Sequence, residues 1–423
     1  MHWNVGVTDD IGDEEEGARL STRQAAERLG VKPETVYAYV SRGLLSSRRS
    51  SGGRGSTFDA AEVEALGRAA RRPAAAAREA APEAMSVRTG ITLIEPDGCW
   101  FRGVDARELA ESCGFEQAAD WLWTGRLVPG LRFTAPEALL AAARAAAEAM
   151  PAHCAAIDRL RAAVVAAAVA DPLRFDLAEE AVLARARGLL PTLVGALPLR
   201  GDNCGAGLVR SLWPRLTERD ATEVFVRALE SAMILLLDHD LAASTLAARV
   251  AASARAHPYA VVSAGLGALD APLHGAASAG AHRMLAEVVE RGSAAAVVAD
   301  ILRAGRRVPG LGHRIYPGED PRARALFTKL EQEPSCAAAL EAAHEVVATA
   351  GRPANIDLAL AVLTLSAGMD PEAGEAVFAV ARTAGWIAHA LEEYAERPLR
   401  LRPSGHYTGP RPPRPLPTPV PED

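Results

Sequence analysis

The sequence predicts a mainly α-helical protein, on three observations. Alanine dominates the apolar residues, and alanine has the highest helix propensity. Aromatic residues make up only 5% of the chain although 49% of it is hydrophobic, a balance that favours packed helices over sheets. A helical pattern of apolar residues continues from about residue 85 into the 390s. With 423 residues, the chain is long enough for a large core and two or more domains.

Charge and cysteine content exclude several classes of protein. A net charge of -7 argues against a surface that is basic throughout, although it permits a local nucleic-acid-binding module. The five cysteines are scattered and never form a CxxC pair, so we expect no disulfide framework and no metal site. The pattern contains neither an export signal nor a membrane-spanning run, so we expect a cytoplasmic protein without a membrane contact.

Composition divides the chain into five segments. Residues 1–18 are acidic and are expected to be a disordered tail. A basic segment at 19–72 predicts a small domain, and the alanine- and proline-rich residues 73–84 predict a linker. The long helical region covers 85–410, and the proline-rich tail at 411–423 is expected to be extended.

The basic segment has the pattern of two short helices followed by a wing. Ser21 or Thr22 can cap a first helix that ends at Gly30, and Pro33 suits the start of a second helix. Basic residues and glycines follow, and Asp59 can then cap a returning helix. This pattern predicts a winged helix-turn-helix.

The same segment resembles the winged helix-turn-helix of MerR-type and excisionase-like proteins. The resemblance implies binding to duplex DNA through phosphate and groove contacts. The candidate contact residues are Lys32, Tyr37, Arg42, Arg48, Arg49 and Arg54. The alternative is a small solvated domain without a DNA site, because arginine is the preferred basic residue throughout the chain and local arginines therefore count for less.

A loop rich in glycine and proline, VPGLGHRIYPGEDPRA at 308–323, is the first candidate for a small-molecule site. Glycines let the backbone approach a ligand closely, and an arginine fork suits a carboxylate. The loop carries His313, Arg314 and Arg322. These residues indicate a site for an anionic small molecule.

Other stretches far along the chain carry residues of matching chemistry. Each residue alone is more typical of a helix cap or a surface position than of a catalytic role. Together, three histidines, one aspartate and the arginines Arg322, Arg382 and Arg402 can supply a base, hydrogen-bond donors and partners for a dicarboxylate. The candidates outside the loop are His239, His274, Asp357, Phe378, Arg382 and Arg402.

These stretches resemble citrate synthases over about residues 85–409. The motifs HDLAAST, PLHGAA, PGLGHRIYPGEDPRA, NIDLAL, ARTAGWIAH and RPSGHYTG occur in the order and at the spacing of that family. The resemblance implies a helical two-domain subunit, with a smaller domain at about 276–367 inserted in the larger one. It also implies a homodimer whose cleft closes over acetyl-CoA and oxaloacetate, both of them substrates, without a cofactor.

The resemblance gives a role to each candidate. Asp357 removes a proton from the methyl group of acetyl-CoA, His274 holds the thioester oxygen, and His313 polarises the ketone of oxaloacetate. The oxaloacetate-binding set is His239, Arg322, Phe378, Arg382 and, from the partner subunit, Arg402. The candidates for CoA binding are Val308, Gly310, Gly312 and Arg314, and for Arg314 a structural surface role is the alternative.

Departures from the usual family pattern bear on the substrate. Asp240 and Ala242 stand in a motif that commonly reads His-Glu-Leu-Asn-Ala-Ser-Thr, and Ala276 replaces a frequent glycine. The sequence predicts a citrate synthase and leaves open a 2-methylcitrate synthase, which uses propionyl-CoA. The alternative from another class is a DNA-binding regulator that senses a metabolite, but the intact acid–base residues favour the enzyme.

Overall fold

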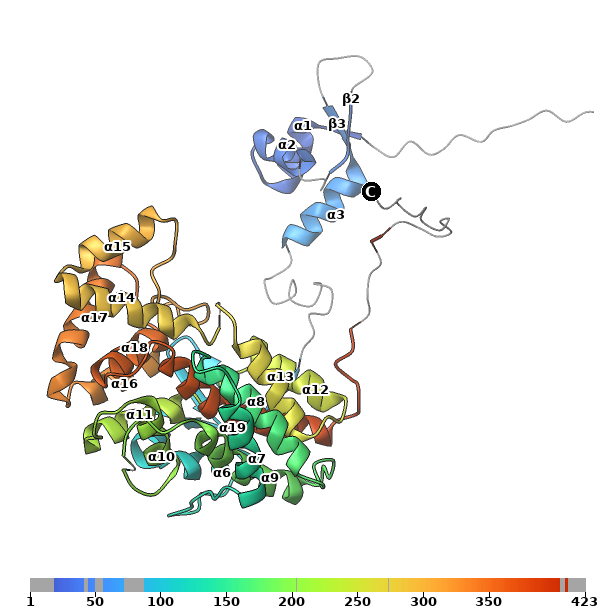
Figure 1. Ribbon diagram of the computed structural model, residues 1–423. Helices are drawn as coiled ribbons and strands as arrows, with labels where there is room; N and C mark the ends of the chain where they lie inside the picture. Colours follow the sequence, from blue (N-terminus) through green and yellow to red (C-terminus); the bar gives the residue numbers. More distant parts are fainter. Residues whose placement is uncertain are drawn as a thin grey trace, which may run out of the picture. The chain divides into compact units, whose positions relative to one another are not determined.

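The computed structural model describes residues 19–41, 45–49, 56–71, 87–202, 204–272, 274–403 and 408–409. Contacts divide the chain into two compact units, Met1–Val87 and Arg88–Asp423. Figure 1 shows the elements of both units. The acidic tail expected at 1–18, the linker expected at 73–84 and the tail expected at 411–423 lie outside the described residues.

The smaller unit combines a helix-turn-helix with a three-stranded antiparallel sheet. Its elements are β1 (Arg19–Ser21), α1 (Thr22–Leu29), α2 (Pro33–Ser41), β2 (Ser47–Arg49), β3 (Ser56–Asp59) and α3 (Ala60–Arg71). Strand β3 lies between β1 and β2, so that Leu20 and Ser47 both pair with Phe58. The buried core of the unit is Leu20, Ala25, Ala26, Val36, Leu45, Phe58 and Val63.

The capping residues expected from the sequence set the boundaries of these helices. The Ser21 side chain accepts a hydrogen bond from the backbone N–H of Gln24 within a capping box, and Gly30 ends α1 in the left-handed conformation, with φ 69°. Asp59 accepts a hydrogen bond from the backbone N–H of Ala61, at 2.8 Å, at the start of α3. The predicted helix-turn-helix is confirmed.

The larger unit is mainly helical, which confirms the predicted fold class. A short antiparallel sheet precedes the helices, with strands β4 (Thr92–Glu95), β5 (Gly98–Phe101) and β6 (Val104–Asp105) in that order. The helices that follow are α5 (Ala106–Ser112), α6 (Phe115–Thr124), α7 (Glu137–Glu148), α8 (Ala156–Ala170), α9 (Glu179–Ala196), α10 (Leu208–Leu216), α11 (Glu223–Leu235), α12 (Ala243–Ser253), α13 (Pro258–Leu269), α14 (Ala277–Arg291), α15 (Ala294–Arg303), α16 (Pro321–Leu330), the 3₁₀ helix η1 (Pro334–Cys336), α17 (Ala337–Ala350), α18 (Ile356–Ser366) and α19 (Ala373–Ala395).

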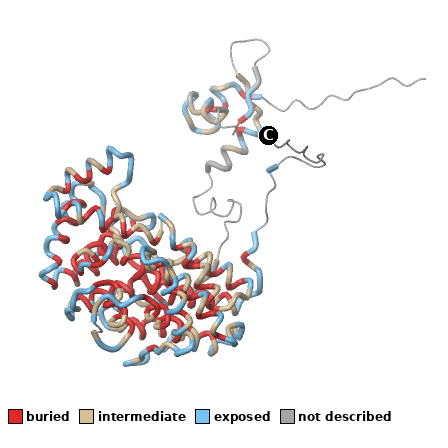
Figure 2. Tube along the Cα trace, viewed as in Figure 1, coloured by how far each residue is buried: buried red, intermediate tan, exposed pale blue. Residues whose placement is uncertain are grey.

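Helix α19 is the central element of the larger unit. It packs against α6, α9, α11, α12, α13 and α14, and almost every residue in its first five turns is buried (Figure 2). Gly385 lets the helix pack closely against the backbone at Leu237. Any larger residue would place its Cβ 2.2 Å from the carbonyl oxygen of Leu237, which is too close. The helix therefore lies directly against the loop between α11 and α12. No helix in the described part of the chain is long and apolar enough to cross a membrane.

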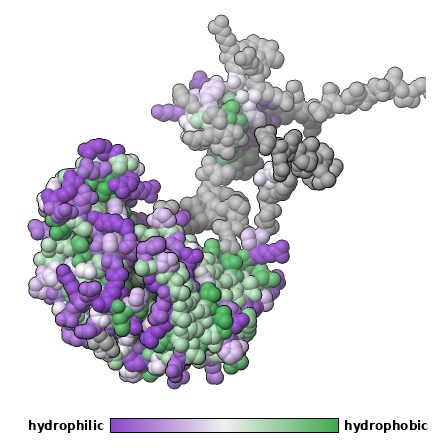
Figure 3. Space-filling view, in the orientation of Figure 1, coloured by the Kyte–Doolittle hydropathy of each residue, from purple (hydrophilic) through white to green (hydrophobic). Residues whose placement is uncertain are grey.

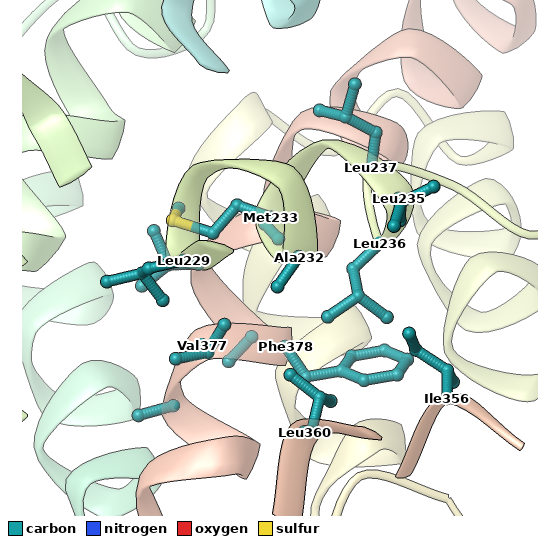
Figure 4. Close-up of a cluster of buried hydrophobic side chains, with 14 of the residues drawn as sticks. Leu229, Ala232, Met233, Leu235, Leu236, Leu237, Ile356, Leu360, Val377 and Phe378 are labelled. Carbon is teal, nitrogen blue, oxygen red and sulfur yellow. The ribbon is translucent and has the colours of Figure 1, made fainter. Parts of the chain in front are cut away.

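Apolar contacts fix the elements that carry the polar candidates. Figure 4 shows Leu236, Ile356, Leu360 and Phe378, which come from the end of α11, from α18 and from α19, in one buried cluster. Ile356 directly precedes Asp357 in the chain, and Leu236 lies three residues before His239. Because a packed core moves little, this cluster holds the polar groups at fixed separations.

Candidate active site

A cavity of about 620 Å³ lies between the loop before α12, the loop before α14, the loop before α16, the start of α18 and the middle of α19. Its size is typical of small-molecule sites. The candidates that line it are His239, His274, Gly312, His313, Arg314, Arg322, Asp357, Phe378 and Arg382. The structure therefore brings together residues from five separate stretches of the sequence.

Asp357 is the second residue of α18, and the side chain of Asn355 caps that helix by accepting a hydrogen bond from the Asp357 N–H at 3.0 Å. The same asparagine donates to the carbonyl oxygen of Gly312 at 2.9 Å, which ties the glycine-rich loop to the helix. Burial raises the pKa of Asp357 to about 6, although the positive charge of Arg322 opposes this shift. A carboxylate with this pKa is ionised at neutral pH and is a stronger base than an exposed one.

His274 lies in the turn before α14, and its Nε2 is 2.8 Å from the hydroxyl oxygen of Ser244 on α12. Burial, with a smaller contribution from Arg382, lowers the pKa of His274 to about 4, so the ring is neutral at physiological pH. If the serine hydroxyl donates to Nε2, the ring proton is on Nδ1. His274 then presents an N–H donor that carries no charge.

His313 is held in the opposite tautomer. Its Nδ1 accepts hydrogen bonds from the backbone N–H groups of Ile315, at 3.1 Å, and Tyr316, at 3.3 Å. Burial, followed by the charge of Arg322, lowers the pKa of His313 to about 4. A neutral ring that accepts at Nδ1 carries its proton on Nε2, which is therefore the donor available to a ligand.

The two buried arginines of the cavity have different partners. Arg322 donates to both carboxylate oxygens of Asp320, at 3.0 and 2.8 Å, and although burial opposes it, this pairing raises the pKa of Arg322. Arg382 donates from Nε to the carbonyl oxygen of Leu236 at 2.9 Å, but its two terminal nitrogens have no hydrogen-bond partner among the described residues. Burial lowers the pKa of Arg382 to about 10. A buried, unpaired guanidinium fork is suited to a carboxylate ligand.

A buried hydrogen-bond network supports the loop that carries His239. Asp238 accepts hydrogen bonds from Thr92, at 2.5 Å, and from the backbone N–H of Asp240, at 3.1 Å, and lies 3.2 Å from His389 on α19. Asp240 has a φ of 52°, a conformation that aspartate tolerates better than most residues. The network therefore fixes an unusual backbone turn directly beside His239.

Three of the candidates do not line the cavity. Val308 packs partly against the core, Gly310 is buried, and Arg402 is exposed outside the cavity. Conversely, Ser244 and Asp320 contact site residues but were not identified from the sequence. Both are polar residues inside the quoted motifs, and Asp320 lies two residues before Arg322 in the chain. An acidic residue so close to an arginine in the chain can pair with it, and this spacing is the sequence signal that could have revealed Asp320.

The residues proposed to contact DNA are only partly described. Lys32 is exposed in the turn between α1 and α2, and Tyr37 is 50% exposed on α2. Arg48 and Arg49 lie in β2. Arg42 and Arg54 lie outside the described residues.

Gly310 determines how closely the glycine-rich loop packs on α18. It has a φ of 76°, and a Cβ added at this position would lie 2.9 Å from the Cβ of Leu358. We expect Gly310→Ala to destabilise the protein by about 2 to 4 kcal/mol, because backbone strain and overpacking add. Denaturant unfolding measures this loss. Gly318→Ala is the control, since Gly318 has no atom within 4 Å of a built Cβ and no positive φ. Equal stability of the two variants would contradict the packing role of Gly310.

Metal ligation is a separate question. No group of histidine, cysteine, aspartate and glutamate side chains in the described ranges is arranged to hold a metal ion.

Family models match two parts of the chain. Residues 83–404 match the model described as citrate synthase, C-terminal domain. Residues 21–55 match the model described as MerR family regulatory protein. The first match includes every residue that lines the cavity, and the second includes α1, α2 and β2.

Individual proteins are also similar to this chain in sequence. "Citrate synthase 2" of Bacillus subtilis is 34% identical over 211 residues, which cover 48% of this chain and 56% of that protein. "Citrate synthase" of Haloferax volcanii is 30% identical over 336 residues, which cover 73% of this chain and 88% of that protein. "2-Methylcitrate synthase" of Mycobacterium tuberculosis is 27% identical over 345 residues, which cover 76% of this chain and 88% of that protein.

Solved structures share the fold. The citrate synthase of Thermoplasma acidophilum, determined as a ternary complex with carboxymethyl coenzyme A and oxaloacetate, aligns with a TM-score of 0.64 and 23% identity. The alignment covers 79% of this chain and 97% of that one. The family model matches residues 83–404, and the fold is that of a solved citrate synthase. The chain belongs to the citrate synthase family.

Proposed function

We propose that the protein condenses acetyl-CoA with oxaloacetate and hydrolyses the resulting citryl thioester to citrate and CoA. The proposal rests on one cavity that holds the Asp357 carboxylate, two histidines that are each hydrogen-bonded at one ring nitrogen, and the Arg382 guanidinium, whose terminal nitrogens have no partner among the described residues. A methyl group next to a thioester is a very weak acid, so its deprotonation needs both a base and a donor that stabilises the enolate. The cavity offers both.

The proposed reaction begins at the acetyl group. The Asp357 carboxylate takes a proton from the methyl carbon, while the Nδ1–H of His274 donates to the thioester oxygen as negative charge develops there. Ser244 holds the other nitrogen of that ring at 2.8 Å and so keeps the donor oriented. Asp357 ends this step protonated, and the acetyl group becomes an enol or enolate.

The second substrate supplies the electrophile. The carboxylates of oxaloacetate pair with Arg382 and Arg322, and the Nε2–H of His313 donates to the ketone oxygen, which makes the carbonyl carbon more electrophilic. The enol carbon then attacks this carbon, and the ketone oxygen takes up a proton to become the hydroxyl group of citryl-CoA. Water cleaves the thioester and releases citrate and CoA. Gly312 and Arg314 line the same cavity and are the proposed contacts for the CoA portion.

The direct test is release of free CoA from acetyl-CoA, followed with a thiol reagent. We expect release only when oxaloacetate is present and without added metal or nucleotide. The same assay with propionyl-CoA tests the alternative 2-methylcitrate synthase, since the two acyl groups differ by one methylene group. A higher kcat/KM for propionyl-CoA would assign that alternative instead.

We also propose that the active form is a homodimer. Apolar side chains are exposed on α8 and on the turn after it, where Val165, Val169, Leu173 and Phe175 are 57%, 74%, 67% and 66% exposed. Hydrophobic residues gather on the face formed by α8, α12 and α13 (Figure 3). A face of this kind supports contact with a second subunit. Arg402, which is exposed and outside its own cavity, is proposed to complete the site of the partner subunit.

Subunit mixing tests this arrangement. Arg402→Ala and Asp357→Asn proteins are each expected to be inactive, but heterodimers contain one site with both wild-type residues. We therefore expect activity to return when the two proteins exchange subunits. The control is either protein mixed with itself. No recovery after demonstrated exchange would place Arg402 outside the partner's site.

The smaller unit is proposed to bind duplex DNA, which is a separate function from condensation. The match of residues 21–55 to MerR regulatory proteins supports this proposal, as does the exposure of Lys32 and Tyr37 at the turn and on α2. The alternative is a regulator that senses a metabolite without catalysis. Such a protein would need the arginines of the cavity to bind the metabolite but would not need Asp357 as a base. We propose a cytoplasmic location, which the five free cysteines support.

Fluorescence anisotropy across a salt series tests DNA binding. We expect the full chain to bind the DNA upstream of its own gene, and a chain that starts at Met85 to bind weakly. If Arg48 and Arg49 each pair with a phosphate, replacing either with alanine should reduce the slope of log affinity against log salt by about one unit. Equal binding by the full and shortened chains would show that the smaller unit does not bind DNA.

A further inference from the structure

Tyr316 is a buried side chain in the loop that carries His313. It lies three residues after His313 and is 1% exposed. Its hydroxyl oxygen is 3.0 Å from Nε2 of His239, and its ring lies against that of His313, with centroids 4.7 Å apart and planes inclined by 31°. The guanidinium carbon of Arg322 is 5.7 Å from the centre of the same ring. One side chain therefore contacts three residues of the proposed oxaloacetate site.

The hydrogen bond between Tyr316 and His239 has a direction. Burial raises the pKa of Tyr316, so the phenol keeps its proton, and a phenol is a better donor to an imidazole nitrogen than an acceptor from it. Burial, together with the charges of Arg322 and Arg382, lowers the pKa of His239 far below its ordinary value, so this ring carries one proton. When the phenol donates to Nε2, that proton must be on Nδ1.

The His239 ring has a second nitrogen for a ligand. The ring is among the side chains that line the cavity, and Tyr316 bonds to its Nε2. An Nδ1–H is therefore the group that this ring can offer to a ligand there.

We propose that Tyr316 is a positioning residue, whose hydroxyl fixes His239 in the tautomer that presents an Nδ1–H donor to a carboxylate of oxaloacetate. This inference rests on the proposed function for the identity of the ligand. The backbone N–H of the same residue bonds to Nδ1 of His313, at 3.3 Å, and so fixes that ring with its proton on Nε2. Tyr316 thus bonds to both histidines, to His239 through its side chain and, together with Ile315, to His313 through its backbone.

Nitrogen NMR of protein labelled at histidine nitrogen tests the tautomer directly, without substrate or activity. We expect the unliganded wild-type protein to show His239 protonated on Nδ1, with the resonance assigned by its loss in His239→Asn. Tyr316→Phe, which keeps the ring and removes the hydroxyl, should shift His239 toward the Nε2–H form and leave His313 unchanged. His239 protonated on Nε2 in the wild-type protein would overturn the proposal without any variant.

Calorimetry and kinetics test the consequence for binding. We expect Tyr316→Phe to weaken oxaloacetate binding about tenfold and to change kcat less than about twofold, because His239 no longer holds its donor toward a charged group. In a His239→Asn background the same change should have no further effect. Tyr259→Phe is the matched control, since its hydroxyl is also buried and donates to Asp171, at 2.9 Å, outside the cavity.

Two results would contradict the positioning role. Oxaloacetate affinity and the His239 tautomer could both remain unchanged in Tyr316→Phe, or Tyr259→Phe could weaken binding equally, which would mark the effect as general destabilisation. Failure of the wild-type protein to condense acetyl-CoA with oxaloacetate would remove the proposed function. It would leave the tautomer measurement intact, so the two failures are distinguishable.

Discussion

Asp357→Asn is expected to lower kcat about a thousandfold while the protein still binds oxaloacetate as the wild type does. Asparagine has nearly the same shape as aspartate but cannot accept the methyl proton, and positioned general bases contribute about 10² to 10⁴ in rate. Arg322 and Arg382, the proposed partners of the oxaloacetate carboxylates, are unchanged in this variant. Stopped assays of citrate formation and calorimetry with oxaloacetate measure the two effects separately.

The stability of this variant separates chemistry from unfolding. Because burial raises the pKa of Asp357 to about 6, the ionised carboxylate is unfavourable in the folded state above that pH, and a neutral amide removes this cost. We therefore expect a thermal midpoint equal to or above that of the wild type at pH 7. Asp300→Asn, at an ion-paired surface position, is the control for the substitution itself. A kcat within tenfold of the wild type would remove Asp357 from the mechanism.

Arg382→Met is expected to weaken oxaloacetate binding about a hundredfold or more. The two terminal nitrogens of Arg382 have no partner among the described residues, so a ligand carboxylate gains both hydrogen bonds at once. Hydrogen bonds to charged groups contribute about 1.5 to 3 kcal/mol each, and about 1.4 kcal/mol corresponds to a factor of ten in affinity. Methionine fills a similar volume over the Phe378 ring, whose centre lies 4.6 Å from the guanidinium carbon.

Thermal shifts with and without oxaloacetate measure this effect. A ligand that binds only the folded protein raises the midpoint, and the rise should disappear in Arg382→Met while the unliganded midpoint changes little. The small change is expected because removing a buried, unpaired charge offsets the absence of the hydrogen bond to the Leu236 carbonyl. Arg303→Met, at a side chain that is 75% exposed, is the control. Wild-type affinity in Arg382→Met would show that the fork does not hold the substrate.

The sequence predicted those features of the fold that depend on neighbouring residues. Ser21, Gly30 and Asp59 set helix boundaries through local caps, and each lies where the pattern placed it. The sheet β4–β5–β6 was not predicted, because chain-wide alanine content outweighed a short hairpin signal. Thr92 to Glu95 and Gly98 to Phe101 flank a Pro-Asp turn, which is the local signal that identifies this hairpin.

The candidate site was predicted in part, for a related physical reason. The motifs identified the charged and acid–base residues, and the structure places most of them in one cavity. The motifs could not show which groups hold these residues in place. Ser244 lies 30 residues from His274 in the chain, and Tyr316 lies 77 residues from His239. Such pairs exist only in the folded chain, so tautomers and unpaired donors required the structure.

Deuterium carried from acetyl-CoA into the product tests the proposed condensation. Acetyl-CoA with three deuterium atoms on its methyl group is mixed with oxaloacetate and the full-length protein, and the product is analysed by mass spectrometry. If Asp357 removes one methyl hydrogen before the carbon attacks the ketone, the product is citrate that retains two deuterium atoms. Absence of citrate with the wild-type protein, or citrate formed at the same rate by Asp357→Asn, would contradict the proposed reaction at this cavity.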